Sequence, residues 1–297
     1  MTNSRIGVVV ITHRRKYEAL EAVARLTDLP ERPPIVLVDN GSGDGTAEAV
    51  RDKFPQVDVL ALDHNAGAVG RNLGVGRLDT PYIAFCDDDT WWEPGSLAAA
   101  VEALDAHPRL AVVNARIVAE PGGREDPIVA ELRDSPVPGP DWLPGPALGS
   151  FLAGAAVVRR EAFESAGGFS ERLWLGGEEE LLATDLLSEG WEICYLDRLT
   201  VHHAASPQRD ATRRRRDGLR NTLWFTWLRR PAGPALRRTF FLARTAPRDR
   251  TTFLAWWDAV RGLPWVLAGR RARPKAVERR LAPLDAAQRA SKARRYV

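Results

Sequence analysis

This sequence is poor in cysteine, contains no long hydrophobic run and shows no signal-peptide pattern in its first residues. Its 297 residues include two cysteines, Cys86 and Cys194, each inside an apolar run typical of a buried strand. This usage predicts buried thiols in a reducing compartment rather than a disulfide framework. No apolar run reaches the roughly 18 residues that a membrane-spanning helix needs. Residues 1–5 lead into a predicted strand without a signal-peptide pattern, so we expect a cytoplasmic protein.

Acidic and basic residues are unevenly distributed along the chain. Residues 1–204 contain 18 Lys and Arg against 33 Asp and Glu, a net charge of −15. Residues 205–297 contain 24 against 6, a net charge of +18. An acidic body followed by a basic region predicts two parts with different partners. We therefore expect a first domain at residues 1–205 and a basic, Trp- and Arg-rich helical region at 206–297.

Buried strands alternate with helical segments in the first 90 residues. Ile6–Ile11 and Ile35–Val38 are continuous apolar runs, and Val57–Leu62 and Tyr82–Cys86 are also strand-like. Continuous apolar runs are typical of strands that are buried on both faces. Their alternation with helices predicts an α/β fold with a doubly wound sheet. Such sheets bind ligands at the carboxyl ends of their strands.

Polar clusters follow all four of these strands. They are Thr12–Arg15, Asp39–Thr46, Asn65–Asn72 and Asp87–Asp89. Three adjacent carboxylates repel one another, whereas Mg²⁺ or Mn²⁺ takes oxygen ligands and keeps phosphates in its coordination shell. A solvated acidic turn is the alternative for an isolated Asp-Asp-Asp. The coincidence of four strand ends favours a metal-held diphosphate instead.

Further acidic and basic motifs follow downstream. Glu178–Glu180 begin a predicted helix, where carboxylates could simply favour the helix dipole. His202 and His203 end a strand-like segment. Residues 120–146 are rich in Pro and Gly, which predicts a mobile loop over the site or an ordinary long connection.

Taken in order, these motifs resemble the family-two inverting glycosyltransferases of GT-A fold. The motifs are VVITHRR at 9–15, VDNGSGDGT at 38–46, NAGAVGRNLG at 65–74, FCDDD at 85–89, AGGFSE at 166–171, GGEEELL at 176–182 and HH at 202–203. The resemblance covers about residues 5–205 and is nearest to bacterial rhamnosyltransferases and cell-surface glycan enzymes. It implies a GT-A type nucleotide-binding sheet with a basic helical extension. It also implies a UDP- or dTDP-sugar donor and an acceptor that is a glycan, a lipid-linked sugar or a small molecule.

The resemblance implies donor-binding roles at the strand ends. Arg71 is expected on the diphosphate, because a guanidinium group and free backbone N–H groups both favour phosphate. A plain surface charge is the alternative. Asp39 would accept a hydrogen bond from the base or the ribose, unless it caps an Asx turn. The full set is Thr12, Arg15, Asp39, Asn65, Gly67, Arg71, Asp87 and Asp88.

The resemblance also implies a metal site and a base. Asp89 is the expected direct ligand of Mg²⁺ or Mn²⁺, with Asp87 nearer the ribose or a metal-bound water. His203 is a further metal or phosphate contact, or else His202, because a slip of one residue reverses the face. Glu179 matches the base that takes the acceptor's proton. Glu178 is the second candidate, since relatives commonly have Glu-Asp here.

Aromatic and basic residues interleave in the C-terminal region. Five of the ten tryptophans lie between residues 224 and 265, among arginines. This composition favours an anionic membrane surface bound through residues 213–267, which would make the protein peripheral on the inner face of the cell membrane. Packing on the acidic domain and a protein partner are the alternatives. We expect no nucleic acid, because no nucleic-acid motif is present.

Two other functions remain to be weighed. A sugar-phosphate nucleotidyltransferase would share the nucleotide-binding sheet, but it would need a Gly-rich loop after the first strand and a catalytic Lys. This chain has Thr-His-Arg-Arg there. A binding protein with an inactive site is disfavoured by the intact acidic clusters at 87–89 and 178–180.

Overall fold

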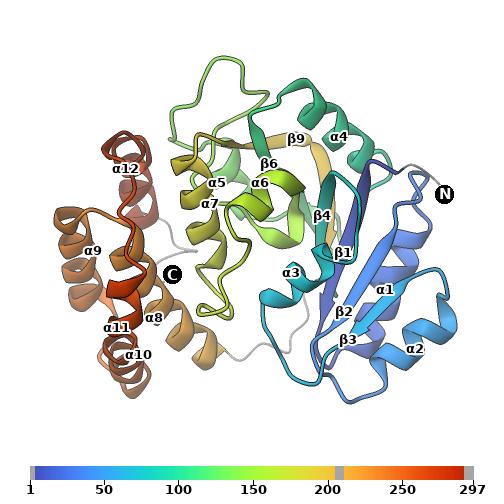
Figure 1. The fold of residues 1–297 in the computed structure, drawn as a ribbon, viewed down its shortest axis with the longest axis horizontal. Coiled ribbons are helices and arrows are strands. Elements are labelled where there is room, and N and C mark those ends of the chain that lie inside the picture. The colour runs from blue at the N-terminus through green and yellow to red at the C-terminus, as the bar shows by residue number, and fades with distance from the viewer. Residues whose placement is uncertain (1–3, 205–210, 291–297) are drawn as a thin grey trace.

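The computed structural model describes residues 4–204 and 211–290. In this part of the chain nine strands join one sheet, which helices cover (Figure 1). The strands are β1 (Ile6–Thr12), β2 (Ile35–Asp39), β3 (Asp58–Ala61), β4 (Tyr82–Asp87), β5 (Thr90–Trp92), β6 (Leu110–Ala119), β7 (Arg124–Glu125), β8 (Ala156–Arg159) and β9 (Glu192–His203). Their order is β3-β2-β1-β4-β8-β6-β9-β5, and β7 pairs with β6.

The first half of the sheet is parallel, as the alternating pattern predicts. β1 lies between β2 and β4 and pairs with both in parallel, and β2 pairs with β3. The side chains of β2 are all buried, as are nearly all of those of β1 and β4. Cys86 and Cys194 are buried and unpaired, which confirms their expected role as small core residues. The α/β fold is therefore confirmed.

The second half of the sheet is mixed. β8 runs antiparallel between β4 and β6, and β5 runs antiparallel to β9. The helices of residues 4–204 are α1 (Lys16–Thr27), α2 (Thr46–Lys53), α3 (Val69–Val75), α4 (Ser96–Ala106), α5 (Ile128–Arg133), α6 (Arg160–Ser165) and α7 (Glu178–Ser188). A short 3-10 turn, η1 (Ala153–Ala155), precedes β8.

Strand register brings the predicted polar clusters together. Thr12 at the end of β1 pairs with Asp39 at the end of β2, and Ile11 pairs with Asp87 at the end of β4. On the other side, Thr90 of β5 pairs with His203 at the end of β9. The carboxyl ends of these strands thus form one edge of the sheet, where an α/β fold places its ligand.

The Pro- and Gly-rich segment at 120–146 contains more regular structure than its composition predicts. Arg124 and Glu125 pair with the end of β6, and α5 buries Val129 and Leu132 against the sheet. A helix of six residues is too short to show a clear hydrophobic period in the sequence. The segment is therefore partly anchored rather than a plain loop.

The C-terminal helices form a layer beside α7. They are α8 (Ala211–Arg229), α9 (Ala232–Thr245), α10 (Arg250–Arg261), α11 (Leu263–Ala268) and α12 (Lys275–Ala290). α8 packs against α7 on one side and against α9, α10 and α11 on the other (Figure 1). Leu173 and Leu181 share one apolar cluster with Phe225, Leu228 and Val266. The predicted boundary at 205/206 lies outside the described residues.

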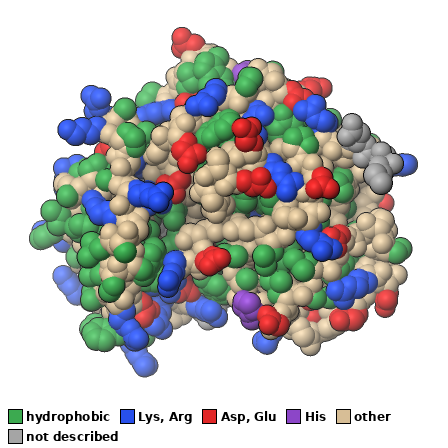
Figure 2. Space-filling view, in the orientation of Figure 1, with side chains coloured by type: hydrophobic (Ala, Val, Ile, Leu, Met, Phe, Trp, Pro, Cys, Tyr) green, Lys and Arg blue, Asp and Glu red, His purple; other side chains and the backbone are tan. Residues whose placement is uncertain are grey.

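Packing and surface exposure divide the aromatic residues of this layer. Trp224, Trp227 and Trp265 pack against the cluster between α7 and α8, so intramolecular packing is the better account of these three. Phe240, Phe253 and Trp257 are exposed instead. Figure 2 shows hydrophobic and basic side chains intermixed over the part of the molecule where α9–α11 lie. Within residues 4–204 and 211–290, no helix is both long and apolar enough to cross a bilayer.

Candidate active site

Each carboxylate of the Asp87–Asp89 triplet has an arginine partner. An Arg71 Nη2 lies 2.5 Å from Asp87 Oδ1. Arg15 Nη1 donates to Asp88 Oδ1 at 2.9 Å and to Asp89 Oδ2 at 3.1 Å. The two arginines offset the repulsion between the three acids and fix their directions. The triplet is an organised cluster, not a solvated turn.

Asp88 lies in the enclosed part of this cluster, together with Asp89. It is buried, and it also accepts a hydrogen bond from Thr12 Oγ1 at 2.9 Å. Burial raises the pKa of Asp88 to about 7, and the neighbouring Arg15 opposes this shift. Through its hydrogen bonds Asp88 fixes the positions of the Thr12 and Arg15 side chains. Its predicted contact with the donor stays a prediction.

Asp87 has the opposite exposure. Its side chain is 41% exposed, and it lies against Gly154 of η1. A Cβ at Gly154 would come within 2.8 Å of Asp87 Oδ2, so glycine keeps this carboxylate accessible. The sequence analysis missed Gly154, although an isolated glycine in a strand-like run indicates close approach.

Asp89 and His203 lie close together at this edge of the sheet. His203 Nε2 lies 3.7 Å from Asp89 Oδ1. Two ligands of one Mg²⁺ lie about 2.0–2.1 Å from it, so a pair can span up to about 4 Å. Within residues 4–204 and 211–290, no group of three His, Cys, Asp or Glu side chains converges on one point. The pair suits an ion that completes its shell with water and phosphate oxygens.

His202 points away from this pair. Its Nδ1 lies 3.0 Å from Glu120 Oε1, and its ring stacks on Trp91 with 5.6 Å between the ring centres. Consecutive strand residues face opposite sides of a sheet, which explains the difference from His203. The geometry favours His203 over His202 as a metal contact.

Arg71 is more enclosed than its expected diphosphate role predicts. It is 3% exposed, and its guanidinium carbon lies 5.6 Å from the ring centre of Phe169. Its Nε and Nη1 are buried without a protein hydrogen-bond partner. A plain surface charge is therefore wrong for Arg71. It pairs with Asp87, and its contact with a diphosphate stays a prediction.

The loops after β2 and β3 have turn geometry. Asp39 Oδ1 accepts the backbone N–H of Ser42 at 3.0 Å, which is the Asx turn considered as an alternative. Asn65 Oδ1 accepts the N–H of Gly67 at 2.9 Å. Gly67 has a φ of +62°, which favours glycine. These contacts shape the loops, and the predicted donor contacts of Asp39, Asn65 and Gly67 remain predictions.

The three acids at the start of α7 have three different environments. Glu178 is buried, and its Oε2 has no hydrogen-bond partner. Burial and, next, the charge of Glu179 raise the pKa of Glu178 to about 8. Glu179 is half-buried, and its Oε1 accepts the backbone N–H of Ala153 at 2.7 Å. Glu179 thus faces η1, which also carries Gly154 beside Asp87.

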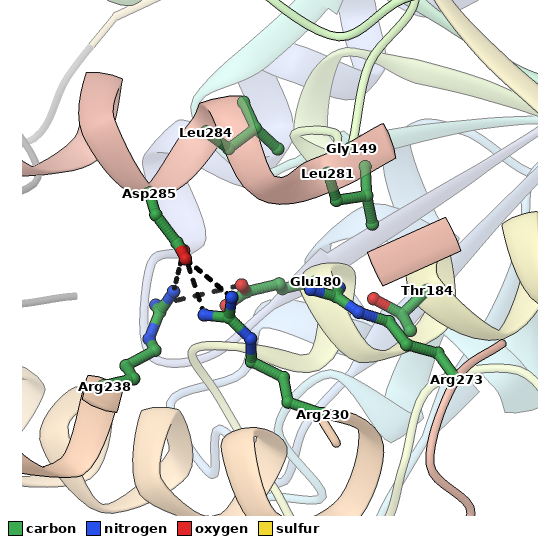
Figure 3. A pocket seen from close by; sticks show the side chains of 9 residues that line it. All are labelled: Gly149, Glu180, Thr184, Arg230, Arg238, Arg273, Leu281, Leu284 and Asp285. Atoms are coloured by element: carbon green, nitrogen blue, oxygen red, sulfur yellow. Dashed lines mark hydrogen bonds and ion pairs between the residues drawn. The ribbon is translucent and has the colours of Figure 1, made fainter. Parts of the chain in front are cut away.

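Glu180 points to the C-terminal layer instead of the site. It lies 3.8 Å from Arg238, which also pairs with Asp285 of α12 (Figure 3). Arg230 lines a small cavity together with Glu180 and Arg238. It pairs with Asp285 and with Glu278. The structure thus separates Glu180 from the two residues predicted to be catalytic.

The geometry can now be compared with known proteins. A family model described as "Glycosyl transferase family 2" matches residues 7–167, which is more than half of the chain. The chain belongs to glycosyl transferase family 2. This confirms the resemblance seen in the motifs, and the matched region contains Thr12, Asp39, Arg71 and the Asp87–Asp89 triplet.

Relatives in this family share much of the chain. It is 28% identical over 235 residues to "N-acetylglucosaminyl-diphospho-decaprenol L-rhamnosyltransferase" of Mycobacterium tuberculosis, which covers 67% of this chain and 76% of that protein. It is 30% identical over 110 residues to the "Uncharacterized glycosyltransferase YwdF" of Bacillus subtilis, covering 34% of this chain and 40% of that protein. The protein is therefore a glycosyltransferase, and the homology supports transfer from a nucleotide sugar.

Solved structures agree on the fold. The structure of the mannosyltransferase PcManGT from Pyrobaculum calidifontis, solved with GDP-Man and Mn²⁺, matches with a TM-score of 0.58 at 19% identity, covering 98% of this chain and 82% of that chain. S. aureus TarS 1–349 matches with a TM-score of 0.59 at 19% identity, covering 94% and 85%. These likenesses confirm the GT-A fold of the family-two glycosyltransferase.

Glu178 predicts a measurable pH dependence of stability. An acid whose folded-state pKa is raised binds more protons folded than unfolded between the two pKa values, so stability falls as pH rises through that interval. For Glu178 this interval runs from 4.5 to about 8. Within this interval, Glu178 should lower the free energy of unfolding of the wild type by up to about 1.4 kcal/mol for each pH unit. Glu178→Gln should abolish this contribution. Urea unfolding of both proteins at pH 5, 6.5 and 8 measures it.

The matched control is Glu171→Gln, because Glu171 is an exposed acid in the segment before α7. It should keep the wild-type pH dependence. If Glu178→Gln and Glu171→Gln both follow the wild-type curve, the buried carboxyl of Glu178 does not carry the proton assigned to it.

Proposed function

We propose that this glycosyltransferase is metal-dependent and inverting, and that it moves a sugar from a UDP or dTDP carrier to an acceptor hydroxyl. The observation that carries the proposal is the meeting of strand ends. Thr12 pairs with Asp39 across β1 and β2, Asp87 ends β4 opposite Ile11, and Asp89 lies 3.7 Å from His203. The rhamnosyltransferase relative supports a lipid-linked acceptor, since its name specifies a decaprenol-linked sugar. We therefore place the reaction in cell-surface glycan or glycolipid synthesis.

Residues of the sheet edge would hold the donor. Asp89 and His203 would bind Mg²⁺ or Mn²⁺, which when bound neutralises the charge of the departing nucleoside diphosphate. Arg15 keeps Asp89 aimed at this position through its 3.1 Å hydrogen bond. Asp87 is open enough to contact the ribose or a water molecule, while Arg71 neutralises it from the buried side.

Glu179 is the proposed general base. It would take the proton from the acceptor hydroxyl as the oxygen attacks the sugar carbon on the side opposite the leaving group, which inverts the configuration. Glu178 is less suited to this task, because its raised pKa keeps it protonated at neutral pH. The hydrogen bond from Ala153 orients Glu179 toward the segment that borders Asp87. The two neighbouring acids thus have separate tasks.

Metal removal tests the cation site. EDTA should lower the release of UDP or dTDP from a nucleotide sugar by about 100-fold, because the leaving group then departs without its counter-charge. Added Mn²⁺ should restore it. Asp89→Asn should require more Mn²⁺, whereas Asp52→Asn, at an exposed acid of α2, should not. Full activity in EDTA would contradict the metal-dependent mechanism.

Glu179→Gln tests the base. The amide keeps the shape of the side chain but cannot accept a proton, so kcat should fall by about 100-fold or more. The affinity for UDP or dTDP with Mn²⁺, measured by calorimetry, should stay unchanged. Glu178→Gln is the matched control and should keep most of the activity. The opposite pattern would make Glu178 the base.

We also propose that α9–α11 contact an anionic membrane surface. Each of these helices exposes apolar residues at helical spacing, namely Leu236 and Phe240, then Phe253, Trp257 and Val260, then Leu263 and Leu267. Phe240 is 69% exposed and Phe253 is 67% exposed, although both are large apolar side chains. The opposite stripes, which include Leu242, Ala255 and Val266, are buried. The outward stripes therefore have no partner within the described chain.

Charge favours a lipid surface as the proposed partner. Residues 231–274 contain nine arginines and two acids, Asp249 and Asp258. Both acids pair with arginines of α8, at 2.5 Å from Arg215 and 2.7 Å from Arg216. The outer face thus presents apolar and basic groups without a competing acid, which suits anionic headgroups. Such a surface would bring the enzyme to a lipid-linked acceptor.

Vesicle binding tests this surface. The triple variant Phe240→Gln, Phe253→Gln, Trp257→Gln should bind phosphatidylglycerol vesicles about tenfold more weakly than the wild type, because it loses the inserted apolar area. Neither protein should bind pure phosphatidylcholine well. Trp142→Gln, at a 42% exposed tryptophan of the catalytic domain, is the matched control. Equal binding by the triple variant, or dimers of the wild type that the triple variant lacks, would exclude the membrane assignment.

A further inference from the structure

The segment between α6 and α7 is held by one side chain of the C-terminal region. Asn221 of α8 is fully buried, and its Nδ2 donates to three backbone carbonyl oxygens. These are the oxygens of Leu173 at 2.7 Å, Leu175 at 3.1 Å and Gly176 at 2.6 Å. An amide NH₂ group has two donor hydrogens, so the three carbonyls share them. One side chain therefore binds three of the four carbonyl oxygens of residues 173–176.

This segment has backbone conformations that need outside support. Trp174 has a φ of +60°, which is rare for a residue with a side chain, and Gly176 and Gly177 have values of +90° and +83°. Such conformations persist where the surrounding contacts hold them. Gly177 is also the N-cap of α7, and a Cβ there would lie 3.5 Å from the Cβ of Asn221. Asn221 thus packs where α7 begins.

The other side of the same segment contacts the loop after β3. The carbonyl oxygen of Trp174 accepts the N–H of Ala68 at 2.7 Å, and its indole Nε1 donates to the carbonyl oxygen of Asn65 at 3.1 Å. A Cβ at Gly67 would come within 2.3 Å of the Trp174 oxygen. The segment therefore links α8 to the loop after β3 and leads directly to Glu178 and Glu179.

We propose that Asn221 is a positioning residue for glycosyl transfer, which sets the start of α7 and hence the place of the Glu179 carboxylate. This inference rests on the proposed role of Glu179 as the base. Without the three hydrogen bonds the carbonyls would turn toward other donors, and the first turn of α7 would shift. A general base acts only within hydrogen-bond reach of its proton, so a small shift is costly. The C-terminal region then supplies part of the catalytic geometry as well as a surface.

Asn221→Asp is the sharpest test, because it keeps the shape but replaces the donor with an acceptor facing three carbonyls. We expect kcat for nucleotide release to fall by about 100-fold, by the cost of a misplaced catalytic group. The affinity for UDP or dTDP with Mn²⁺, whichever stabilises the wild type, should change less than about threefold. Amide hydrogen exchange should rise in residues 173–182. Thr226→Val is the matched control, since Thr226 is fully buried on α8 and its hydroxyl has no partner.

The outcomes separate positioning from mere stability. A fall in kcat with local exchange and unchanged nucleotide affinity supports the proposal. A parallel loss of kcat and nucleotide affinity, or unchanged exchange in 173–182, overturns it. If Asn221→Asp lowers kcat in this way while Glu179→Gln stays active, the base assignment fails and the positioning of α7 stands. Exchange data require no catalysis, so they are conclusive even for a weakly active variant.

Discussion

Buried carboxylates at the end of β4 and at the start of α7 impose a constraint, because a buried charge needs a partner or has to be neutralised. The structure meets this constraint with arginines, which present several donors in a fixed plane. Arg15 spans Asp88 and Asp89, and Arg71 reaches Asp87 from the buried side. Burial raises the pKa of Glu178 to about 8, against the opposing charge of Arg71. The more accessible acids have partners of their own, which are Arg71 for Asp87 and the Ala153 N–H for Glu179.

The same constraint explains the uneven charge of the chain. Arginines of the basic region face acids of the catalytic part, as in the bidentate pair of Arg229 with Asp185 and the pair of Arg280 with Glu192. Others pair with the few acids of their own region, such as Arg230 with Asp285. Part of the +18 charge is therefore internal to the fold. The arginines left over on α9–α11 are those that surround the exposed apolar stripes.

The parallel half of the sheet was predictable because its strands are buried on both faces and leave continuous apolar runs. Parallel strands have their carboxyl ends at the same edge of the sheet. Recognising these runs therefore also located Thr12, Asp39 and Asp87. His203 could not be distinguished from His202, since the register of β9 shifts between Leu196 and Thr200 and the facing side cannot be counted along the chain. The burial of Arg71 depends on Phe169 and Glu178, far away in sequence. Asn221 carries no motif at all, because its partners are backbone carbonyls that leave no trace in the side-chain pattern.

The contact between α7 and α8 also has a consequence for the order in which the protein can form. A ribosome completes the nucleotide-binding strands long before it adds Asn221, about forty residues after Glu179. Domains that emerge first generally fold first. Until α8 arrives, Leu173 and Leu181 lack the apolar partners that cover them, and the carbonyls of Leu175 and Gly176 lack the donor that Asn221 supplies. The strands at the sheet edge can thus form before the start of α7 gains its support from α8.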